Sequence, residues 1–422
     1  MSAAAGGGVP RPDRLRAALA SQITSQLLRL LLVLALGGWL ARYLGPSALG
    51  QLSYVTALIG VLAPLGSLGV KGSLATLLIE PEPISGLVST ALALELAGTL
   101  LLALVVLPVA WLSGDGSIPV LLTLGVLANL FNSAEVYEAD LLCRQRGTVV
   151  GRVGILKVLT GAVATVIALF ARAPLWLFGS VQAVQNACWA VALIQAAKAP
   201  SLRRLRRELN AEAARALLRR GMPLLLAALS IMLYMKSDQV MLQWLRGSDD
   251  VGQYSIAVRM AESLYFIPVI LADTFLPRIA GDPQTPGFSP ELRRFYRLAW
   301  LIGIAMMLGC MVLLPPCVPL IFGDQYRPAM TALLCLGPAT FSACTGCASG
   351  AWLNANGRVG LYAQRSAFGA AVNISLNCLM IPRFGILGAA VTTSISHFAS
   401  VYLYPLFISG TRANTLRLLY PW

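Results

Sequence analysis

Long apolar runs separated by short polar stretches recur along the whole sequence, and this pattern limits the fold more than any single motif. A membrane-spanning helix needs about 20 predominantly apolar residues. We therefore expect an all-α polytopic membrane protein with about twelve spans. Their expected ranges are 23–44, 50–70, 87–112, 118–142, 149–171, 175–197, 221–245, 252–276, 296–315, 329–352, 359–381 and 386–409.

The composition agrees with this expectation. The 422 residues are 57% hydrophobic and 12% charged, and the mean hydropathy is +0.73. A soluble domain carries about a quarter charged residues. Because the spans occupy most of the chain, no room remains for a large soluble catalytic domain.

The basic side chains set the expected orientation. The net charge is +14, and the Lys and Arg residues concentrate in the loops of one side. Cytoplasmic loops are enriched in Lys and Arg, so we expect both termini in the cytoplasm and no role for nucleic acid. The loops of the opposite side hold few cations, namely Arg42, Arg172, Arg246, Arg327 and Arg383.

An internal repeat predicts the domain organisation. Gly45-x4-Gly50-Gln51-x-Ser53 recurs 202 residues later as Gly247-x4-Gly252-Gln253-x-Ser255. Six spans return the chain to the same side, so we expect two parallel six-helix lobes with a substrate path between them. The expected segments are a cytoplasmic start (1–22), the first lobe (23–197), a basic cytoplasmic linker (198–220), the second lobe (221–409) and a cytoplasmic tail (410–422).

The linker contains the run Arg203, Arg204, Arg206 and Arg207. Such a stretch is typical of a segment that contacts anionic lipid headgroups. A specific partner site in the linker is the alternative.

Several ionisable residues fall within the expected spans. Each costs about 2.5 to 3.5 kcal/mol at the bilayer centre, so it needs a partner or a watery cavity. Arg259 and Glu262 are three residues apart and can pair, with Asp273 further along the same expected helix. Two interpretations stay open: ion pairs that join helices, or cations that line a cavity for an anion. The candidates are Arg29, Lys157, Lys236 and Arg259 for an anionic substrate, and Glu135, Glu138, Asp238, Glu262 and Asp273 for ion pairing or coupling.

Metal or cofactor sites are not expected. Cys344 and Cys347 have CxxC spacing, but the chain has a single histidine, His397, to complete a zinc site. The sequence has no GxxxxGK[ST] phosphate-binding loop. We therefore expect a transporter without a cofactor, with coupling to protons, sodium or the membrane potential left open.

Six motifs are spread in order over most of the chain: Arg42-Tyr43-Leu44-Gly45-Pro46, Pro64-Leu65-Gly66-Ser67-Leu68-Gly69, Tyr234-x3-Asp238-Gln239-x-Met241-Leu242, Ile321-Phe322-Gly323-x2-Tyr326, Asn354-x-Asn356-Gly357 and Ile381-Pro382-Arg383-Phe384-Gly385-Ile386-x-Gly388. Together these motifs resemble the Wzx-type polysaccharide flippases of the multidrug, oligosaccharidyl-lipid and polysaccharide exporter superfamily.

This resemblance implies two six-helix lobes that form a V around a central cavity. It also implies translocation of undecaprenyl-pyrophosphate-linked oligosaccharide across the bacterial inner membrane for surface polysaccharide or lipopolysaccharide synthesis. Arg29 and Arg259 would lie by a lateral gate, and Lys236 in the second lobe. Expected partners are the lipid-linked oligosaccharide, membrane lipids, a polysaccharide polymerase and a chain-length regulator.

Two other functions remain as alternatives. One is a drug or metabolite antiporter of the same superfamily. The other is a membrane glycosyltransferase or polymerase, for which a long outer loop with catalytic Arg or His would be expected and is absent from the sequence.

Overall fold

The computed structural model describes residues 12–80, 82, 84–113, 116–199, 205, 207–280 and 289–422, and these residues contain helices and no strand. The first part of the chain forms seven of the helices. They are α1 (Pro12–Ser67), α2 (Val70–Leu78), α3 (Leu87–Ser113), α4 (Ile118–Asn132), α5 (Glu135–Cys143), α6 (Gly147–Phe170) and α7 (Leu175–Ala197).

The second part of the chain is also helical, with π-helical turns inserted before α13 and after α15. Its elements are α9 (Ala211–Leu245), α10 (Ser248–Glu262), α11 (Phe266–Ala280), α12 (Pro290–Leu308), η1 (Gly309–Leu313), α13 (Leu314–Phe322), η2 (Asp324–Tyr326), α14 (Pro328–Ala355), α15 (Val359–Phe398), η3 (Ala399–Leu403), α16 (Tyr404–Phe407) and α17 (Ser409–Leu419).

Within the described ranges, ten helices are long and apolar enough to cross a membrane. Two of them contain a glycine with non-helical backbone angles, Gly45 in α1 and Gly385 in α15. The first two expected spans lie on either side of Gly45, and the last two on either side of Gly385. Each of the twelve expected spans therefore has a helical counterpart, and the chain is a multi-pass membrane protein.

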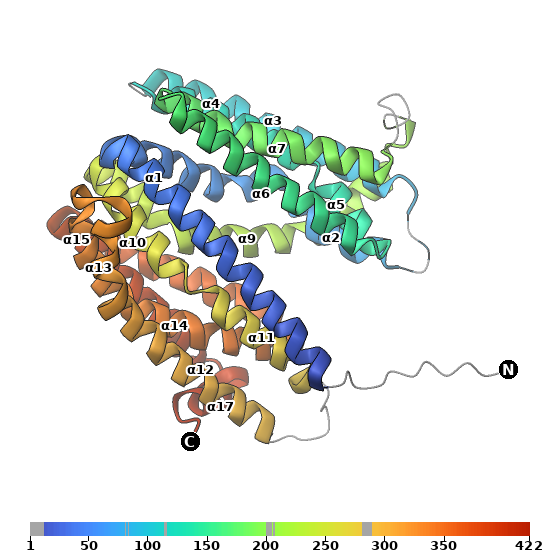
Figure 1. Ribbon diagram of the computed structural model, residues 1–422. Coiled ribbons are helices and arrows are strands. Elements are labelled where there is room, and N and C mark those ends of the chain that lie inside the picture. Colours follow the sequence, from blue (N-terminus) through green and yellow to red (C-terminus); the bar gives the residue numbers. More distant parts are fainter. Residues whose placement is uncertain are drawn as a thin grey trace.

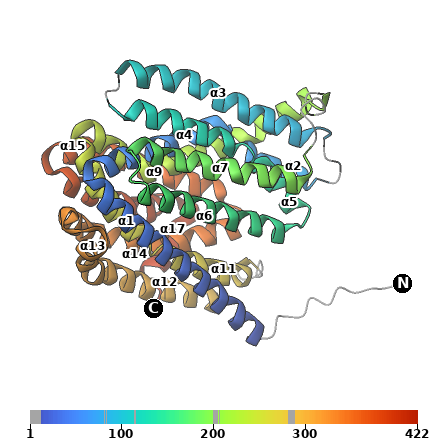
Figure 2. The same cartoon turned by 45° about the horizontal axis from the view of Figure 1, so that its top comes forward.

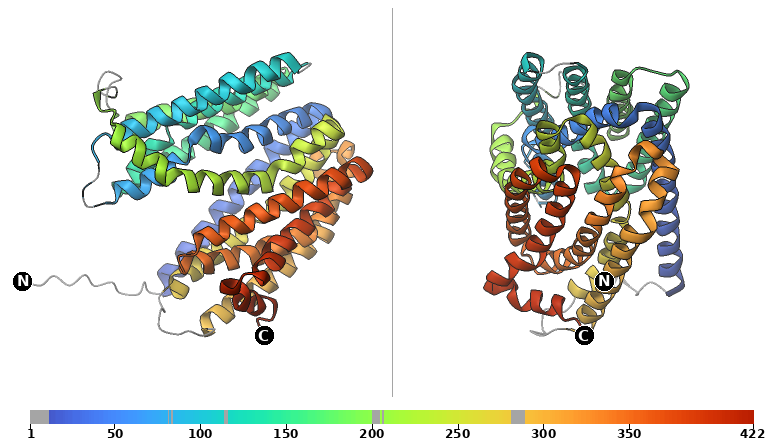
Figure 3. Two further views of the ribbon diagram at one scale, coloured as in Figure 1. Left: turned by 180° about the vertical axis from the view of Figure 1, so that it is seen from behind. Right: turned by 90° about the vertical axis from the view of Figure 1, so that its left-hand side faces the viewer.

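The helices form two groups. In Figure 1, α3, α4, α6 and α7 lie along one side of the molecule, and α12, α14 and α15 lie along the other. Helix α9 runs between them, as the turned views of Figures 2 and 3 also show. The first half of α1 crosses the bundle diagonally and reaches the second group of helices.

The repeated motif has the same backbone conformation in both places. Gly45 has φ 75° and ψ 171°, and Gly247 has φ 96° and ψ 179°. Positive φ values strain any residue with a Cβ atom, so glycine is required at both turns. The two motifs thus form equivalent turns, as their spacing in the sequence predicts.

The second glycines of the two motifs pack against each other's turns. A Cβ atom on Gly50 would lie 1.7 Å from the Ser248 carbonyl oxygen, and one on Gly252 would lie 2.0 Å from the Pro46 carbonyl oxygen. Ser248 and Pro46 each follow the first glycine of their motif. This reciprocal pair of contacts, which we call the glycine clasp, joins α1 to α10 across an approximate twofold relation.

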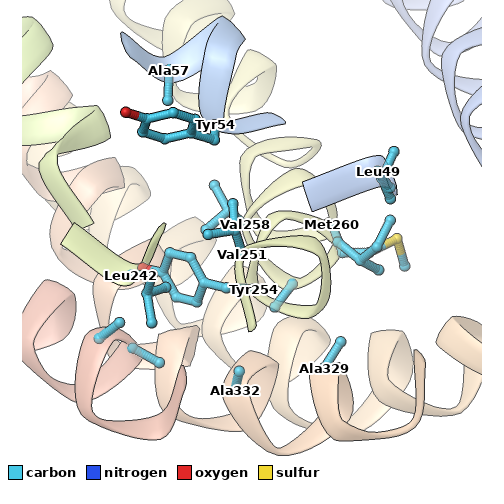
Figure 4. Packing of buried hydrophobic residues seen from close by; sticks show 14 of the residues in the cluster. Leu49, Tyr54, Ala57, Leu242, Val251, Tyr254, Val258, Met260, Ala329 and Ala332 are labelled. Carbon is cyan, nitrogen blue, oxygen red and sulfur yellow. The ribbon is translucent and has the colours of Figure 1, made fainter. Parts of the chain in front are cut away.

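Hydrogen bonds surround the glycine clasp. The Tyr326 hydroxyl donates to the Ala41 carbonyl at 3.0 Å, and the Gln253 side-chain amide donates to the Gln325 carbonyl at 2.7 Å. The Arg42 Nε donates to the Ile321 carbonyl at 3.0 Å, where α13 ends. Buried apolar residues of α1, α9, α10 and α14 pack beside these bonds, among them Leu49, Leu242, Tyr254 and Ala332 (Figure 4).

Helix α9 connects the two groups of helices. Near its start, Gly221 packs on the chain between α1 and α2, where an added Cβ would lie 2.7 Å from the Leu68 carbonyl oxygen. The Arg220 Nη1 contacts the Glu80 carboxylate at 2.7 Å. Near its end, the Ser237 hydroxyl donates to Asn373 of α15 at 2.9 Å. The helix begins at Ala211, ten residues before the expected span, because Asn210 caps it by accepting the Glu212 amide at 2.8 Å.

The clasp predicts the effect of alanine at its glycines. Gly50→Ala and Gly252→Ala each place a methyl group against a backbone carbonyl, so each should destabilise the protein by about 1–3 kcal/mol and lower its Tm. Gly309→Ala is the control, because no atom lies within 4 Å of its added Cβ. That change should be neutral or slightly stabilising. Thermal unfolding of the purified protein in detergent measures all three, and equal Tm values would contradict the clasp.

Candidate functional site

Three adjoining cavities lie beside α1, and between them they contain most of the ionisable candidates. The first, the amide pocket, has a volume of about 670 Å³ between α1, α4, α6 and α7. The second, the interface pocket, has about 190 Å³ between α1, α9 and α10. The third, the charged pocket, has about 1040 Å³ between α5, α6 and α7. Asn132 and Gln185 line both the amide and the charged pockets, and Arg259 lines both the amide and the interface pockets.

Arg259 stands where the amide and interface pockets meet. It lies on α10, and its guanidinium contacts the first half of α1 at Gly37, where an added Cβ would lie 2.8 Å from Nη1. Within the part of the chain that the structure describes, no carboxylate lies within salt-bridge distance of this guanidinium. It is therefore a cation inside the membrane region with its charge directed into a cavity.

Glu262 pairs with Lys236 and not with Arg259, so the expected pairing along one helix is wrong. The Lys236 Nζ lies 3.3 Å from the Glu262 Oε1, with both side chains partly exposed to the interface pocket. Glu262 is the last residue of α10, so its carboxylate can reach α9. The ion pair joins α9 to α10 and leaves Arg259 without that partner.

The charged pocket brings together the candidates of α5 and α6. Glu135 and Glu138 occupy the first turn of α5. The Glu135 carboxylate forms a salt bridge with Lys71 of α2. The Lys157 Nζ lies 3.8 Å from the ring centre of Trp189, a cation–π contact, and it shares the pocket with Glu138. Lys157 therefore shares a pocket with both carboxylates, although Lys71 is the pairing partner of Glu135.

Two of the carboxylate candidates lie away from the three cavities. Asp238 is buried in the second part of the molecule and accepts hydrogen bonds from the hydroxyls of Tyr254 and Thr393. Asp273 is exposed on α11. The charged stripe expected from Arg259 to Asp273 is interrupted, because α10 ends at Glu262 and α11 begins at Phe266.

Arg29 cannot be placed in the site. Its backbone belongs to α1, but its side chain lies outside the part of the chain that the structure describes. Its position beside the gate therefore stays a prediction.

Sequence reasoning missed a set of uncharged amide side chains that line one part of the otherwise largely apolar amide pocket. Asn129 and Asn132 are three residues apart on α4, and Gln182, Gln185 and Asn186 are three and four residues apart on α7. These spacings place each set on one helix face, which is the signal that could have identified them. Arg365 was also missed as a candidate: it is 6% exposed within α15, where Nη2 donates to the Gly346 carbonyl.

The arrangement offers a cation and uncharged amides that can bind a polar ligand. No group of three His, Cys, Asp or Glu side chains that could hold a metal occurs in the described ranges. Cys344 and Cys347 donate to the carbonyls of Ala299 and Pro268, and His397 stacks on Tyr234. The three cavities adjoin one another, mix apolar and polar lining residues, and hold the positive charge of Arg259 where two of them meet.

The observed ion pair predicts an energetic coupling. Lys236→Met and Glu262→Gln should each destabilise the protein, and the double variant should recover part of the loss, because neither charge is then left unpaired. The pair is partly exposed, so the coupling should be about 1 kcal/mol. Thermal unfolding of the four proteins gives this value. Coupling of Glu262 to Arg259 instead would contradict the assigned partner.

Comparison with known proteins identifies the family. A family described as "Polysaccharide biosynthesis protein" matches residues 39–331. The chain is 23% identical over 391 residues to the "Probable low-salt glycan biosynthesis flippase Agl15" of Haloferax volcanii, covering 88% of this chain and 78% of that protein.

Two solved structures share the fold. One is an inward-facing multidrug resistance MATE family transporter of the MOP superfamily, with TM-score 0.74 and 16% identity over 92% of this chain and 95% of that chain. The other is the lipid II flippase MurJ in an inward closed conformation, with TM-score 0.74 and 13% identity over 95% of this chain and 90% of that chain. The expected family and fold are therefore confirmed: the chain belongs to the polysaccharide biosynthesis protein family.

Proposed function

We propose that this protein is a flippase that moves undecaprenyl-pyrophosphate-linked oligosaccharide repeat units across the bacterial inner membrane for surface polysaccharide synthesis. The family, the glycan flippase named among its relatives and the fold shared with a lipid II flippase support this function. The observation that carries the proposal is Arg259, a cation in a membrane cavity with no carboxylate partner in the described ranges.

An unpaired cation within a bilayer is costly, by about 2.5 to 3.5 kcal/mol at the centre, and it marks a functional site by default. The diphosphate of a lipid carrier would supply the missing counter-charge, and a guanidinium can donate two parallel hydrogen bonds to phosphate oxygens. Leu32 and Val33 line the amide pocket and are partly exposed, so an apolar tail could leave beside α1. Lys236, Lys157 and Arg29 are further candidates for contacts with the phosphates.

The proposed orientation places both termini in the cytoplasm and the glycine clasp at the outer side. The excess of Lys and Arg in the loops of the opposite side supports this orientation. The pairing of cations with acidic residues at the clasp end supports it too. There Arg246 pairs with Asp250 at 3.0 Å and Arg327 with Asp324 at 3.0 Å. In this orientation the clasp closes the outer side of the cavities, and transport requires a second state in which it opens.

The substrate's charge provides one source of driving force. An inside-negative membrane potential repels anions, so moving an anion outward is favourable by about 2.3 kcal/mol per charge per 100 mV. For coupling to protons or sodium, Glu262 lines the interface pocket and Glu135 and Glu138 line the charged pocket, whereas Asp238 already accepts two hydroxyl hydrogen bonds. A polymerase and a chain-length regulator would use the product at the outer side.

The proposal predicts the behaviour of Arg259 variants. Arg259→Gln removes a charged hydrogen bond, which should weaken substrate binding roughly ten- to a hundredfold. Arg259→Lys should also impair transport, because an ammonium cannot reproduce the guanidinium's paired donors. Complementation of a strain that lacks the gene, with surface polysaccharide as the readout and membrane expression checked, measures both effects.

Arg327→Gln is the matched control, because Arg327 is exposed and pairs with its neighbour Asp324 outside the cavities. It should restore full surface polysaccharide. Full restoration by Arg259→Gln at normal expression would contradict the phosphate contact. Drug resistance conferred by the wild-type protein without polysaccharide export would favour the antiporter alternative.

A further inference from the structure

The amide pocket has a composition that the phosphate contact does not explain. Its uncharged polar side chains form one surface, which we call the amide wall: Asn129, Asn132, Gln182, Gln185 and Asn186. Among the described residues that line the pocket, Arg259, at its edge, is the only charged side chain. A cavity built only to attract an anion would need none of these amides.

The amide wall is partly fixed by its own contacts. Asn186 is 1% exposed, and its Nδ2 donates to the Ala128 carbonyl of α4 at 3.0 Å. Its Oδ1 accepts from the Gln182 Nε2 at 3.3 Å. The side chain of Gln185 lies against α6 at Gly161, where an added Cβ would be 2.3 Å from its Oε1. Gly161 thus makes room for this amide.

The other members keep their hydrogen-bonding groups available. Among the described residues, none hydrogen-bonds to the side chains of Asn129, Asn132 and Gln185, and all three line the cavity while only partly buried. A side-chain amide offers two donors and an acceptor. A sugar hydroxyl both donates and accepts, so a row of amides matches a polyhydroxylated molecule without adding charge.

The position of the wall relative to Arg259 gives the direction of binding. Arg259 lies where the amide pocket adjoins the interface pocket, and Asn132 and Gln185 lie where it adjoins the charged pocket. A diphosphate at Arg259 would place the attached saccharide along the wall. The pocket's volume of about 670 Å³ lies within the range of roughly 300–1,000 Å³ that is usual for ligand sites.

We propose that the amide wall binds the saccharide next to the diphosphate, and that this saccharide is uncharged. The proposal rests on the proposed function and adds to it the part of the cavity that recognises sugar. An acidic sugar would bring a second negative charge to a pocket whose described lining holds no cation beyond Arg259. Selection among saccharides then depends on hydrogen bonds from α4 and α7.

The test compares two synthetic probes that bind the purified protein in nanodiscs. One is a short isoprenyl diphosphate, and the other is the same diphosphate that carries a neutral disaccharide. The variants are Asn132→Leu and Gln185→Leu, which keep similar volume on two different helices. Gln195→Leu is the matched control, because Gln195 is exposed on the same helix as Gln185 and lines none of the three pockets.

The wild-type protein should bind the disaccharide probe more tightly than the bare diphosphate. Each amide variant should weaken the disaccharide probe about fivefold, the effect of one neutral hydrogen bond, and leave the bare diphosphate unchanged. Gln195→Leu should change neither affinity. Because the two variants lie on different helices, a folding failure in one, detected by its Tm, leaves the other as the test.

Two results would overturn the assignment while the proposed function stands. They are equal affinity of the wild-type protein for both probes, and equal weakening of both probes by the amide variants. Binding of neither probe to the wild-type protein would instead contradict the proposed function, and the saccharide assignment would fail with it.

Discussion

The architecture depends on the close approach of two glycine turns. Gly50 lies against the Ser248 carbonyl and Gly252 against the Pro46 carbonyl, at separations that no Cβ atom would tolerate. This reciprocal contact joins the two halves of the duplicated sequence at one end. Hydrogen bonds and buried apolar side chains surround the clasp, because the close contact of the two turns brings α1 and α10 together. The interface pocket, lined by Leu49 and Ser255, lies next to this closed end, whereas the charged pocket lies away from it.

The pairing of charges around the cavities distinguishes Arg259 from the other cations. The structure neutralises Lys236 with Glu262 and Lys71 with Glu135, and it holds Lys157 on the face of Trp189. Arg259 differs, because its charge faces two cavities and no carboxylate of the described ranges pairs with it. Charged residues within a membrane face a water-filled cavity or pair with other charges or backbone carbonyls, and Arg259 lines such cavities. The neutral amides beside it extend the polar surface without cancelling the charge.

Hydropathy predicted the spans because the membrane requires long apolar helices. The glycine motif predicted the repeated turns because these depend on local turn chemistry. The twelve expected segments and the equivalent turns at Gly45 and Gly247 were visible in the sequence. The ion pairs were not, because they depend on where helices end and which helices meet. Arg259 and Glu262 have helical spacing, yet Glu262 ends α10 and turns to Lys236 on α9. Arg365 was not among the candidate residues, yet the structure buries it within α15.

Reconstitution measures the central claim most directly. Vesicles would contain a fluorescent lipid diphosphate oligosaccharide in both leaflets, and dithionite added outside would quench only the outer leaflet. If the protein moves the lipid-linked glycan, the inner-leaflet fluorescence of wild-type vesicles should also be lost, and more slowly with Arg259→Gln. Protection of that fluorescence in wild-type vesicles, as in protein-free vesicles, would contradict the account.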